Sequence, residues 1–169
     1  MSTPTYYATV DTPIGPFTAI ESGGTVLASG WTSTIDDLMG VIHPTLRPLD
    51  PSPRSELGDV TKAVLRYHEG DVTAIDPIPV RQLSGPFLLV AWDVLRRVQP
   101  GEPVTYTEYA ELAGNPLAVR AAASACARNA AALFVPCHRV LRSDGSLGGF
   151  RWGVQIKRWL LDHEADGRG

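Results

Sequence analysis

The sequence predicts an α+β protein in which a small domain with an antiparallel sheet precedes a mostly helical domain. β-prone runs separated by Gly and Pro turns fill the first third, whereas the second half is rich in Ala and in helix start and stop signals. An extended stretch with two prolines, Asp76–Val80, separates the two parts. We therefore expect an N-terminal domain over residues 1–80 and a C-terminal domain over residues 85–166.

Three strands begin the N-terminal domain. Tyr6–Val10 and Phe17–Ile20 flank a turn-like segment, and Thr25–Ala28 follows a Gly23-Gly24 turn. Runs of this kind joined by tight turns indicate an antiparallel meander.

Helix and loop signals follow the strands. Ile35–Ile42 is predicted as a short helix, and residues 43–53, with four prolines, as an irregular loop. Between Val60 and Tyr67, four apolar residues have the i, i+3, i+4, i+7 spacing of one helix face, which predicts a helix over roughly residues 55–69.

The second half opens with an apolar helix, Phe87–Val98, which Pro100-Gly101 ends. Thr105 and Glu108 fit the capping box that begins a helix. We expect that helix to run to Leu112 or Ala113, with Gly114 as its C′ residue.

Asn115 and Pro116 then predict the N-cap and first residue of a further helix that runs to about Arg128. Two short helices joined by a tight turn are a helix-turn-helix candidate. An ordinary αα-hairpin has the same local pattern, and that pattern alone favours the hairpin.

The charge is distributed unevenly along the chain. The net charge is −3, but residues 1–99 hold seven basic and eleven acidic side chains, residues 100–160 seven and four, and the last nine one and three. A mildly basic region inside an acidic chain permits contacts with phosphate. A solvated mixed face would give the same count.

Composition excludes several classes of protein. With 169 residues, 44% apolar and 20% charged, the chain can bury a core and is not collagen-like, disordered or a coiled coil. No apolar run approaches the ~20 residues of a membrane span, and the first residues do not resemble a signal peptide, so a cytoplasmic location without membrane contact is expected. Cys126 and Cys137 are too few for a disulfide framework and are expected to be thiols.

The segment Pro136–Val140 is the strongest candidate for chemistry. Cys137 is followed directly by His138 and Arg139, and neighbouring positive groups lower the pKa of a thiol. A thiolate beside His is a recurrent nucleophile. Alternatively, Cys137 fills the core and His138 sits in a turn, because Cys is among the most buried residue types.

A metal site is also conceivable from four residues. These are Cys126, Cys137, His138 and His163, whose spacing matches no zinc finger or ribbon. No metal is therefore expected.

Pro-Cys-His-Arg-Val resembles the active-site motif of the O6-alkylguanine-DNA alkyltransferases, also called methylated-DNA–protein-cysteine methyltransferases. The resemblance extends from about Phe87 to Glu164 and is greatest to the C-terminal domain of the bacterial adaptive-response branch. It rests on motifs in the family's order: Gly101–Tyr106, Gly114–Pro116, Ala118–Ala121, Ser124–Ala127, Asn129, Pro136–Val140, Gly145, Gly149–Gly153, Lys157, Leu160-Leu161 and Glu164. The first third resembles the family's variable, ribonuclease H-like domain only weakly.

The resemblance implies a DNA repair protein that acts once per molecule. Cys137 would attack the alkyl carbon on guanine O6 and keep the group as a thioether, with His138, a bridging water and Glu164 as activators. Tyr106 would donate a proton to the leaving guanine, and Asn129 would brace the turn that bears the cysteine. If Cys137 and His138 lie in an extended strand, their side chains point apart and direct contact is not guaranteed.

The resemblance also implies a partner, double-stranded DNA containing O6-alkylguanine, bound by a monomer without a cofactor. The damaged nucleotide must leave the base stack, at a cost of roughly a few kcal/mol. Arg120 would enter the gap through the minor groove, which discriminates bases poorly. Further DNA contacts are expected from Thr105, Ala121, Arg142 and Arg151.

The expected alkyl pocket is formed by Pro136, Val140, Phe150, Arg151 and Trp152. The bulky Arg151-Trp152 pair replaces smaller residues of many members, which predicts a narrow pocket. Phe150 replaces a common tyrosine, and Ala130 replaces a common proline after Asn129.

Two other functions remain open. One is a non-catalytic alkyl-lesion binding or regulatory helix-turn-helix protein on the same scaffold, although members of that kind lack the motif cysteine. The other is a hydrolase that uses Cys137 and His138 and therefore turns over.

Overall fold

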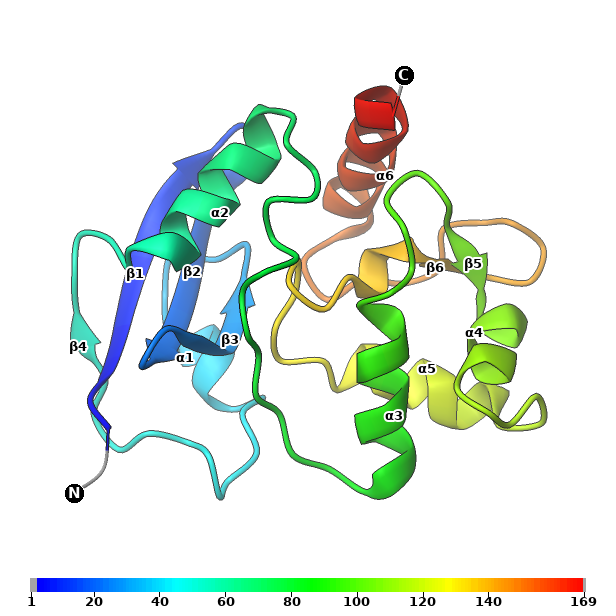
Figure 1. Ribbon diagram of the computed structural model, residues 1–169, viewed down its shortest axis with the longest axis horizontal. Coiled ribbons are helices and arrows are strands. Elements are labelled where there is room, and N and C mark those ends of the chain that lie inside the picture. The colour runs from blue at the N-terminus through cyan, green and yellow to red at the C-terminus, as the bar shows by residue number, and fades with distance from the viewer. Residues whose placement is uncertain (1–2, 169) are drawn as a thin grey trace. The chain divides into compact units, whose positions relative to one another are not determined.

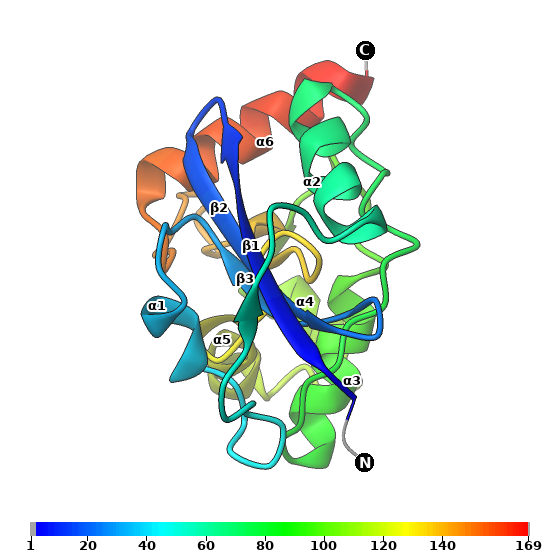
Figure 2. The same cartoon turned by 90° about the vertical axis from the view of Figure 1, so that its left-hand side faces the viewer.

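The first thirty residues form the predicted antiparallel meander. β1 (Thr5–Thr12), β2 (Gly15–Ser22) and β3 (Thr25–Gly30) pair in sequence order and lie side by side in Figure 2. Gly23 and Gly24 join β2 to β3 with φ angles of 61° and 85°, which side chains rarely adopt. The computed structural model describes residues 3–168.

A fourth strand makes the sheet mixed rather than purely antiparallel. β4 (Ser52–Pro53) pairs in parallel with β1 at Tyr6 and Tyr7, which gives the strand order β3-β2-β1-β4. β4 lies inside the segment predicted as irregular loop. Because Pro53 lacks a backbone N–H and the strand has only two residues, the sequence contains no periodic pattern that predicts it.

Two helices complete the N-terminal part. α1 (Asp36–Met39) is shorter than the predicted Ile35–Ile42. α2 (Asp59–Glu69) lies along the sheet in Figure 1 and buries the predicted apolar face from Val60 to Tyr67. It begins four residues later than predicted, because Gly58 has φ 59° and ψ −125°, outside the helical region.

The structure divides into two units. Unit 1 holds the residues up to Leu83 together with Ala130–Phe134, and unit 2 holds Ser84–Asn129 and the chain from Val135 onward. The segment Ala130–Phe134 lies within the expected C-terminal domain, residues 85–166, but belongs to unit 1. Ser29 joins that segment to β3, since its N–H donates to Ala130 O at 2.9 Å and its hydroxyl to Ala132 O at 2.8 Å.

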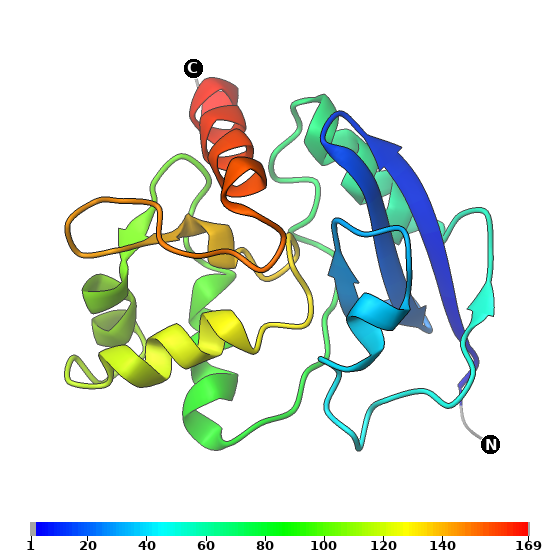
Figure 3. The same ribbon diagram turned by 180° about the vertical axis from the view of Figure 1, so that it is seen from behind.

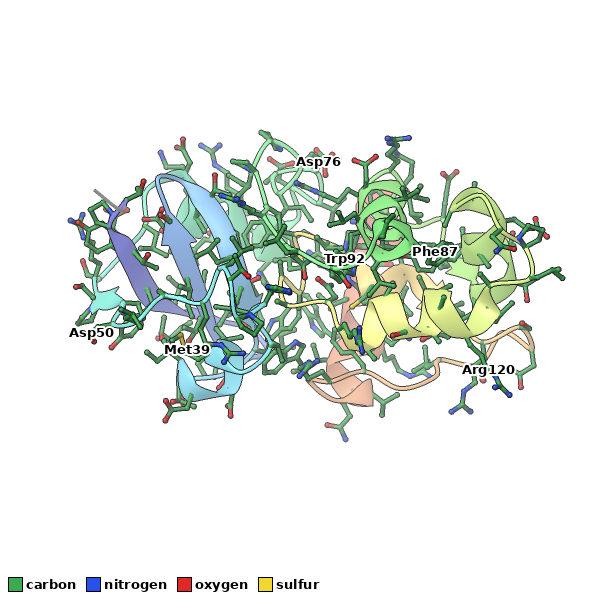
Figure 4. The ribbon with its side chains drawn as sticks, turned by 90° about the horizontal axis from the view of Figure 1, so that it is seen from below. Met39, Asp50, Asp76, Phe87, Trp92 and Arg120 are labelled. Atoms are coloured by element: carbon green, nitrogen blue, oxygen red, sulfur yellow. The ribbon has the colours of Figure 1, made fainter. Side chains whose placement is uncertain are left out.

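Unit 2 contains α3 (Pro86–Leu95), α4 (Tyr106–Leu112) and α5 (Val119–Ala127), which pack on one another (Figure 3). Two aromatic side chains donate hydrogen bonds between these helices. The Trp92 indole N–H, labelled in Figure 4, donates to Ala125 O at 2.8 Å, and the Tyr109 hydroxyl to Ala91 O at 2.7 Å. Both donors are thereby satisfied inside the core.

The segment that holds the predicted Pro136–Val140 motif follows α5. A 3-10 helix, η1 (Cys137–Arg139), leads into β6 (Val140–Leu141), which pairs in parallel with β5 (Val104–Thr105). The last helix, α6 (Val154–Arg168), contacts η1.

The turn between α4 and α5 combines a confirmed prediction with a wrong one. Thr105 caps α4 in the predicted capping box with Glu108, and Gly114 follows it with φ 96°. The prediction that α5 begins at Asn115-Pro116 is wrong. The Asn115 side chain accepts from the N–H of Leu117 in a separate surface turn, and Ala118 has ψ 42°, so the helix begins only at Val119.

Within residues 3–168, every helix is too short or too polar to cross a membrane.

Candidate active site

The turn that bears Cys137 is a 3-10 helix, so Cys137 and His138 do not lie in an extended strand. The Cys137 N–H donates to Val135 O at 2.8 Å, and the Arg139 N–H to Pro136 O at 3.0 Å. The Asn129 amide donates to Val135 O at 2.7 Å and braces the approach to the turn. A tight turn of this kind places consecutive side chains about a third of a revolution apart rather than on opposite faces.

A buried network joins η1 to α6. His138 Nε2 lies 2.7 Å from Glu164 Oε2. Arg139 donates from Nε to Glu164 Oε1 and from Nη2 to Glu164 Oε2, both at 2.9 Å, and from Nη1 to Val98 O at 2.7 Å. His138 and Glu164 have no solvent exposure and Arg139 only 2%. The structure thus brings the predicted His138 and Glu164 together and adds Arg139, to which the sequence assigned no role beyond its charge.

The protonation states of this network follow from its contacts. Burial lowers the pKa of the His138 imidazole, and this effect exceeds the opposite effect of Glu164. Burial raises the pKa of the Glu164 carboxyl, but the hydrogen bonds that His138 and Arg139 donate to it and the positive charge of Arg139 outweigh burial and hold that pKa well below its ordinary value. Glu164 is therefore an ionised acceptor that fixes the orientation of a neutral imidazole.

The Cys137 thiol is 9% exposed, and its pKa is raised, which corrects the expectation of a lowered value. Burial is the dominant cause, because it disfavours the thiolate. A hydrogen bond from Asn129 and the charges of Lys157 and Arg151 act in the opposite direction without reversing the shift. Arg139 does not act on the thiol as the sequence suggested, because its guanidinium is bonded to Glu164.

Lys157 of α6 also lies at this site, although the sequence analysis identified it only as a motif position. Its ammonium is buried and donates to Val140 O at 2.8 Å and to Gly149 O at 3.4 Å. Burial lowers its pKa. A Lys three residues before the apolar Leu160-Leu161 pair was the available sign that this side chain faces inward.

Tyr106 is the first residue of α4 and is half-buried. Burial raises the pKa of its hydroxyl to about 12, and the charges that Cys126 and Cys137 carry when ionised and a hydrogen bond with Cys126 act in the same direction. The hydroxyl therefore stays protonated at neutral pH and can donate a hydrogen bond.

The predicted DNA-binding residues lie at the end of β5, on α5 and in the loop before α6. Arg120 is exposed near the start of α5, labelled in Figure 4, and Ala121 follows it half-buried. Thr105 is half-buried and uses its hydroxyl to accept from the Glu108 N–H. Arg142 and Arg151 are exposed, and Arg151 Nη2 donates to Ala127 O at the end of α5.

The predicted pocket residues differ in burial. Pro136 and Val140 are buried beside the 3-10 turn, Phe150 and Trp152 are half-buried, and Arg151 is exposed. The structure therefore places two of these side chains in the core and three on the loop that precedes α6. Among the described residues, no group of three His, Cys, Asp or Glu side chains is arranged to hold a metal ion.

Comparison with known proteins gives one consistent family. The model for the DNA-binding domain of 6-O-methylguanine DNA methyltransferase matches residues 86–166. The bifunctional transcriptional activator/DNA repair enzyme Ada of Escherichia coli is 42% identical over 107 residues, which cover 63% of this chain and 30% of Ada. The chain thus spans less than a third of that relative's length.

Two further comparisons cover nearly the whole chain. A methylated-DNA–protein-cysteine methyltransferase of Shigella flexneri is 30% identical over 158 residues, 92% of each chain. The crystal structure of the Mycobacterium tuberculosis OGT in complex with DNA has a TM-score of 0.79 at 26% identity and covers 96% of this chain and 94% of its own.

Proposed function

Since the chain belongs to the methylated-DNA–protein-cysteine methyltransferase family, we propose that it repairs DNA by moving the alkyl group of an O6-alkylguanine onto its own Cys137. The observation that carries this proposal is the buried network of His138, Glu164 and Arg139 that begins one residue after the thiol. A neutral, fixed imidazole beside a thiol of raised pKa is what a nucleophile needs when its proton must be removed during the reaction.

The proposed step conserves protons and electrons. The Cys137 thiol proton passes to His138 through the bridging water, and the sulfur attacks the alkyl carbon as the carbon–O6 bond breaks. The bonding electron pair leaves with guanine, which takes a proton from the Tyr106 hydroxyl, and the proton held by His138 restores Tyr106. The product is a thioether, which does not hydrolyse, so each molecule acts once.

DNA binding and alkyl transfer are both assigned to the C-terminal domain, residues 85–166. Arg120 fills the space left by the flipped nucleotide, whose extrusion costs a few kcal/mol. Thr105, Ala121, Arg142 and Arg151 contact the duplex, and Pro136, Val140, Phe150, Arg151 and Trp152 line the alkyl pocket. The protein acts as a monomer in the cytoplasm and needs no cofactor, because the thiol is itself the acceptor.

The non-catalytic lesion binder is not favoured, because Cys137 and its network have no use in a protein that only binds. A hydrolase would release its product and turn over, whereas a thioether accumulates in proportion to the protein.

The proposal is tested by incubating the protein with a duplex that contains one O6-methylguanine and weighing the intact protein and its peptides. One methyl group should replace the thiol hydrogen of the peptide with Cys137, and one equivalent of DNA should saturate the reaction. Cys137→Ser should gain no mass, and the matched Cys126→Ser should still gain it. No added mass, or repeated turnover, would contradict the proposal.

A second substrate tests the pocket. The exposed Arg151 and half-buried Trp152 leave less room than small residues would, so a duplex with O6-benzylguanine should react more slowly than the methyl duplex. Equal rates would show that the pair does not narrow the pocket.

A further inference from the structure

We propose that Arg139 is a positioning residue whose guanidinium holds the Glu164 carboxylate so that His138 stays neutral with Nδ1 free to accept the thiol proton. This inference rests on the proposed function, because it assigns the source of the base that activates Cys137. Nothing in the motif itself predicts it, since an Arg two residues after a Cys is expected to act directly on the thiol.

The guanidinium is fixed at three points. Nε and Nη2 each lie 2.9 Å from a different oxygen of Glu164, and Nη1 lies 2.7 Å from Val98 O. The planar fork of Arg matches a carboxylate in this two-point arrangement, which fixes the plane of the carboxylate. The position and direction of Glu164 Oε2 are therefore set by Arg139 before His138 uses that oxygen.

The orientation of Glu164 decides the tautomer of His138. An ionised carboxylate can only accept, so His138 Nε2, at 2.7 Å from Oε2, must bear the hydrogen. The other ring nitrogen then has a lone pair. His138 Nδ1 is buried and has no hydrogen-bond partner among the protein atoms of the described residues, so it is available to accept the proton of the neighbouring Cys137.

Charge compensation explains why His138 stays neutral. Glu164 is fully buried, and an ionised carboxylate there needs a positive partner. Arg139 is that partner. Without it, His138 would become the cation, and an imidazolium has hydrogens on both nitrogens and accepts none.

The other charged groups near His138 cannot replace Arg139. Lys157 of α6 also disfavours the imidazolium, but its ammonium donates to Val140 O and Gly149 O rather than to Glu164. Burial lowers the pKa of His138, Glu164 raises it, and Arg139 and Lys157 lower it. Removing Arg139 therefore removes one of the two positive charges that lower the pKa of His138, together with the two hydrogen bonds that this charge donates to Glu164.

The first experiment measures the single-turnover rate of methyl transfer against pH for Arg139→Met and Arg139→Lys. Arg139→Met should lose about 100-fold at pH 7, the scale of general-base catalysis, and recover as pH rises, because the imidazolium must first lose its proton. Arg139→Lys keeps the positive charge. Its rate should therefore have the same pH midpoint as the rate of the native protein, and it should lose less rate than Arg139→Met. A loss by the same factor at every pH would assign Arg139 a structural role only and overturn the proposal.

A double variant separates charge from packing. In Arg139→Met/Glu164→Gln no buried carboxylate remains to draw a proton onto His138, so the pH midpoint should return toward the native value. If the pH midpoint of the double variant equals that of Arg139→Met, charge compensation of Glu164 by Arg139 is not what keeps His138 neutral.

The unmodified protein provides a test that does not depend on a variant folding. Nitrogen NMR of the labelled His138 ring should show the Nε2–H tautomer and no protonation between about pH 5 and pH 8, the range in which an ordinary imidazole titrates. An Nδ1–H tautomer, or titration near the ordinary value, would overturn the role of Arg139. Methyl uptake on Cys137 with either of those results would leave the proposed function standing, whereas no uptake with a neutral Nε2–H ring would remove the function and leave the geometry intact.

Discussion

In the proposed reaction, the thiol of Cys137 depends on the groups that accept its proton rather than on an acidity of its own. Burial raises its pKa, and the Asn129 amide, Lys157 and Arg151 only moderate that effect. A thiol that stays protonated until a base accepts its proton is protected from nonspecific alkylation, because the thiolate is the nucleophile. Individual neighbours of the sulfur should therefore affect rate more than they affect binding of DNA.

Asn129 is the residue with the most direct contact to the turn. Asn129→Ala removes the 2.7 Å bond to Val135 O and the hydrogen bond that stabilises the Cys137 thiolate. We expect the free energy of unfolding to fall by about 1–3 kcal/mol, the cost of an unsatisfied buried group. Urea unfolding measures this, and iodoacetamide labelling of Cys137 should become slower at pH 8. Asn115→Ala, which loses an exposed turn contact, is the matched control and should leave labelling unchanged.

Tyr106 tests the proton donor. Tyr106→Phe keeps the half-buried ring but removes the hydroxyl whose pKa is about 12. The rate of methyl transfer should fall by about 10²-fold, the lower end for a general acid, while affinity for the methylated duplex stays within twofold. Single-turnover kinetics and a binding titration measure the two. An unchanged rate would show that guanine leaves without help from this hydroxyl.

At the level of secondary structure, α4 depends on its first turn for stability. Thr105→Ala removes the acceptor of the Glu108 N–H, one half of the capping box. The cost should be about 1 kcal/mol of unfolding free energy. Glu108→Gln is the matched control, because Gln also completes a capping box and should cost less. Thermal unfolding of the three proteins should rank them native, Glu108→Gln, Thr105→Ala, and any other order would contradict the cap as the source of stability.

Elements whose signals are local were predictable from the sequence, and elements made by tertiary contact were not. The capping box at Thr105, the Gly114 terminator and the apolar face of α2 each depend on residues within two turns of one another. β4 exists only because β1 lies beside it, and the 3-10 turn of Cys137 is closed by backbone bonds that no side-chain pattern encodes. The late start of α5 arises from competition, because the Asn115 side chain caps its own short turn.

For the site, the resemblance supplied the residues and the structure supplied their arrangement. Cys137, His138, Glu164 and Asn129 were chosen by motif position, and their roles stay predictions until the reactions above are measured. The contacts of Arg139 and Lys157 could not be predicted, because Val98, Val140 and Gly149 offer backbone carbonyls that any residue type possesses.

The stability of the whole molecule should decrease at both low and high pH. The folded-state pKa values of Glu164 and His138 lie below their ordinary values of 4.5 and 6.5, so the unfolded chain takes up protons first as pH falls. Stability should therefore begin to decrease below about pH 6.5 and decrease more steeply below about pH 4.5. The folded-state pKa of Cys137 lies above 9.0, so the unfolded chain loses its proton first, and stability should also decrease above about pH 9.

Glu164→Gln tests the predicted contribution of Glu164 to the loss of stability at low pH. At pH 7 it should cost about 3–5 kcal/mol, because Arg139 keeps its buried charge without a partner. The difference from the native protein should shrink as pH falls below about 4.5, because Glu164 of the unfolded native chain then binds a proton that the folded state excludes, and the native protein loses stability. Urea unfolding between pH 4 and pH 8 measures this. Glu111→Gln, on the exposed side of α4, is the control and should give a curve parallel to the native one.

The position of Glu164 on α6 has a consequence for folding. Glu164 lies 27 residues after Cys137 in the chain, and it reaches His138 of the Cys137 turn only while α6 is docked through the buried Lys157 and Leu160. Local opening of a single helix is an ordinary fluctuation of native proteins and can be followed by amide hydrogen exchange. Whenever α6 opens, Glu164 leaves His138, and the proposed base loses the carboxylate that orients it although the rest of the fold persists. Under the proposed mechanism, the fraction of molecules able to react at any moment should follow the docking equilibrium of this fifteen-residue helix.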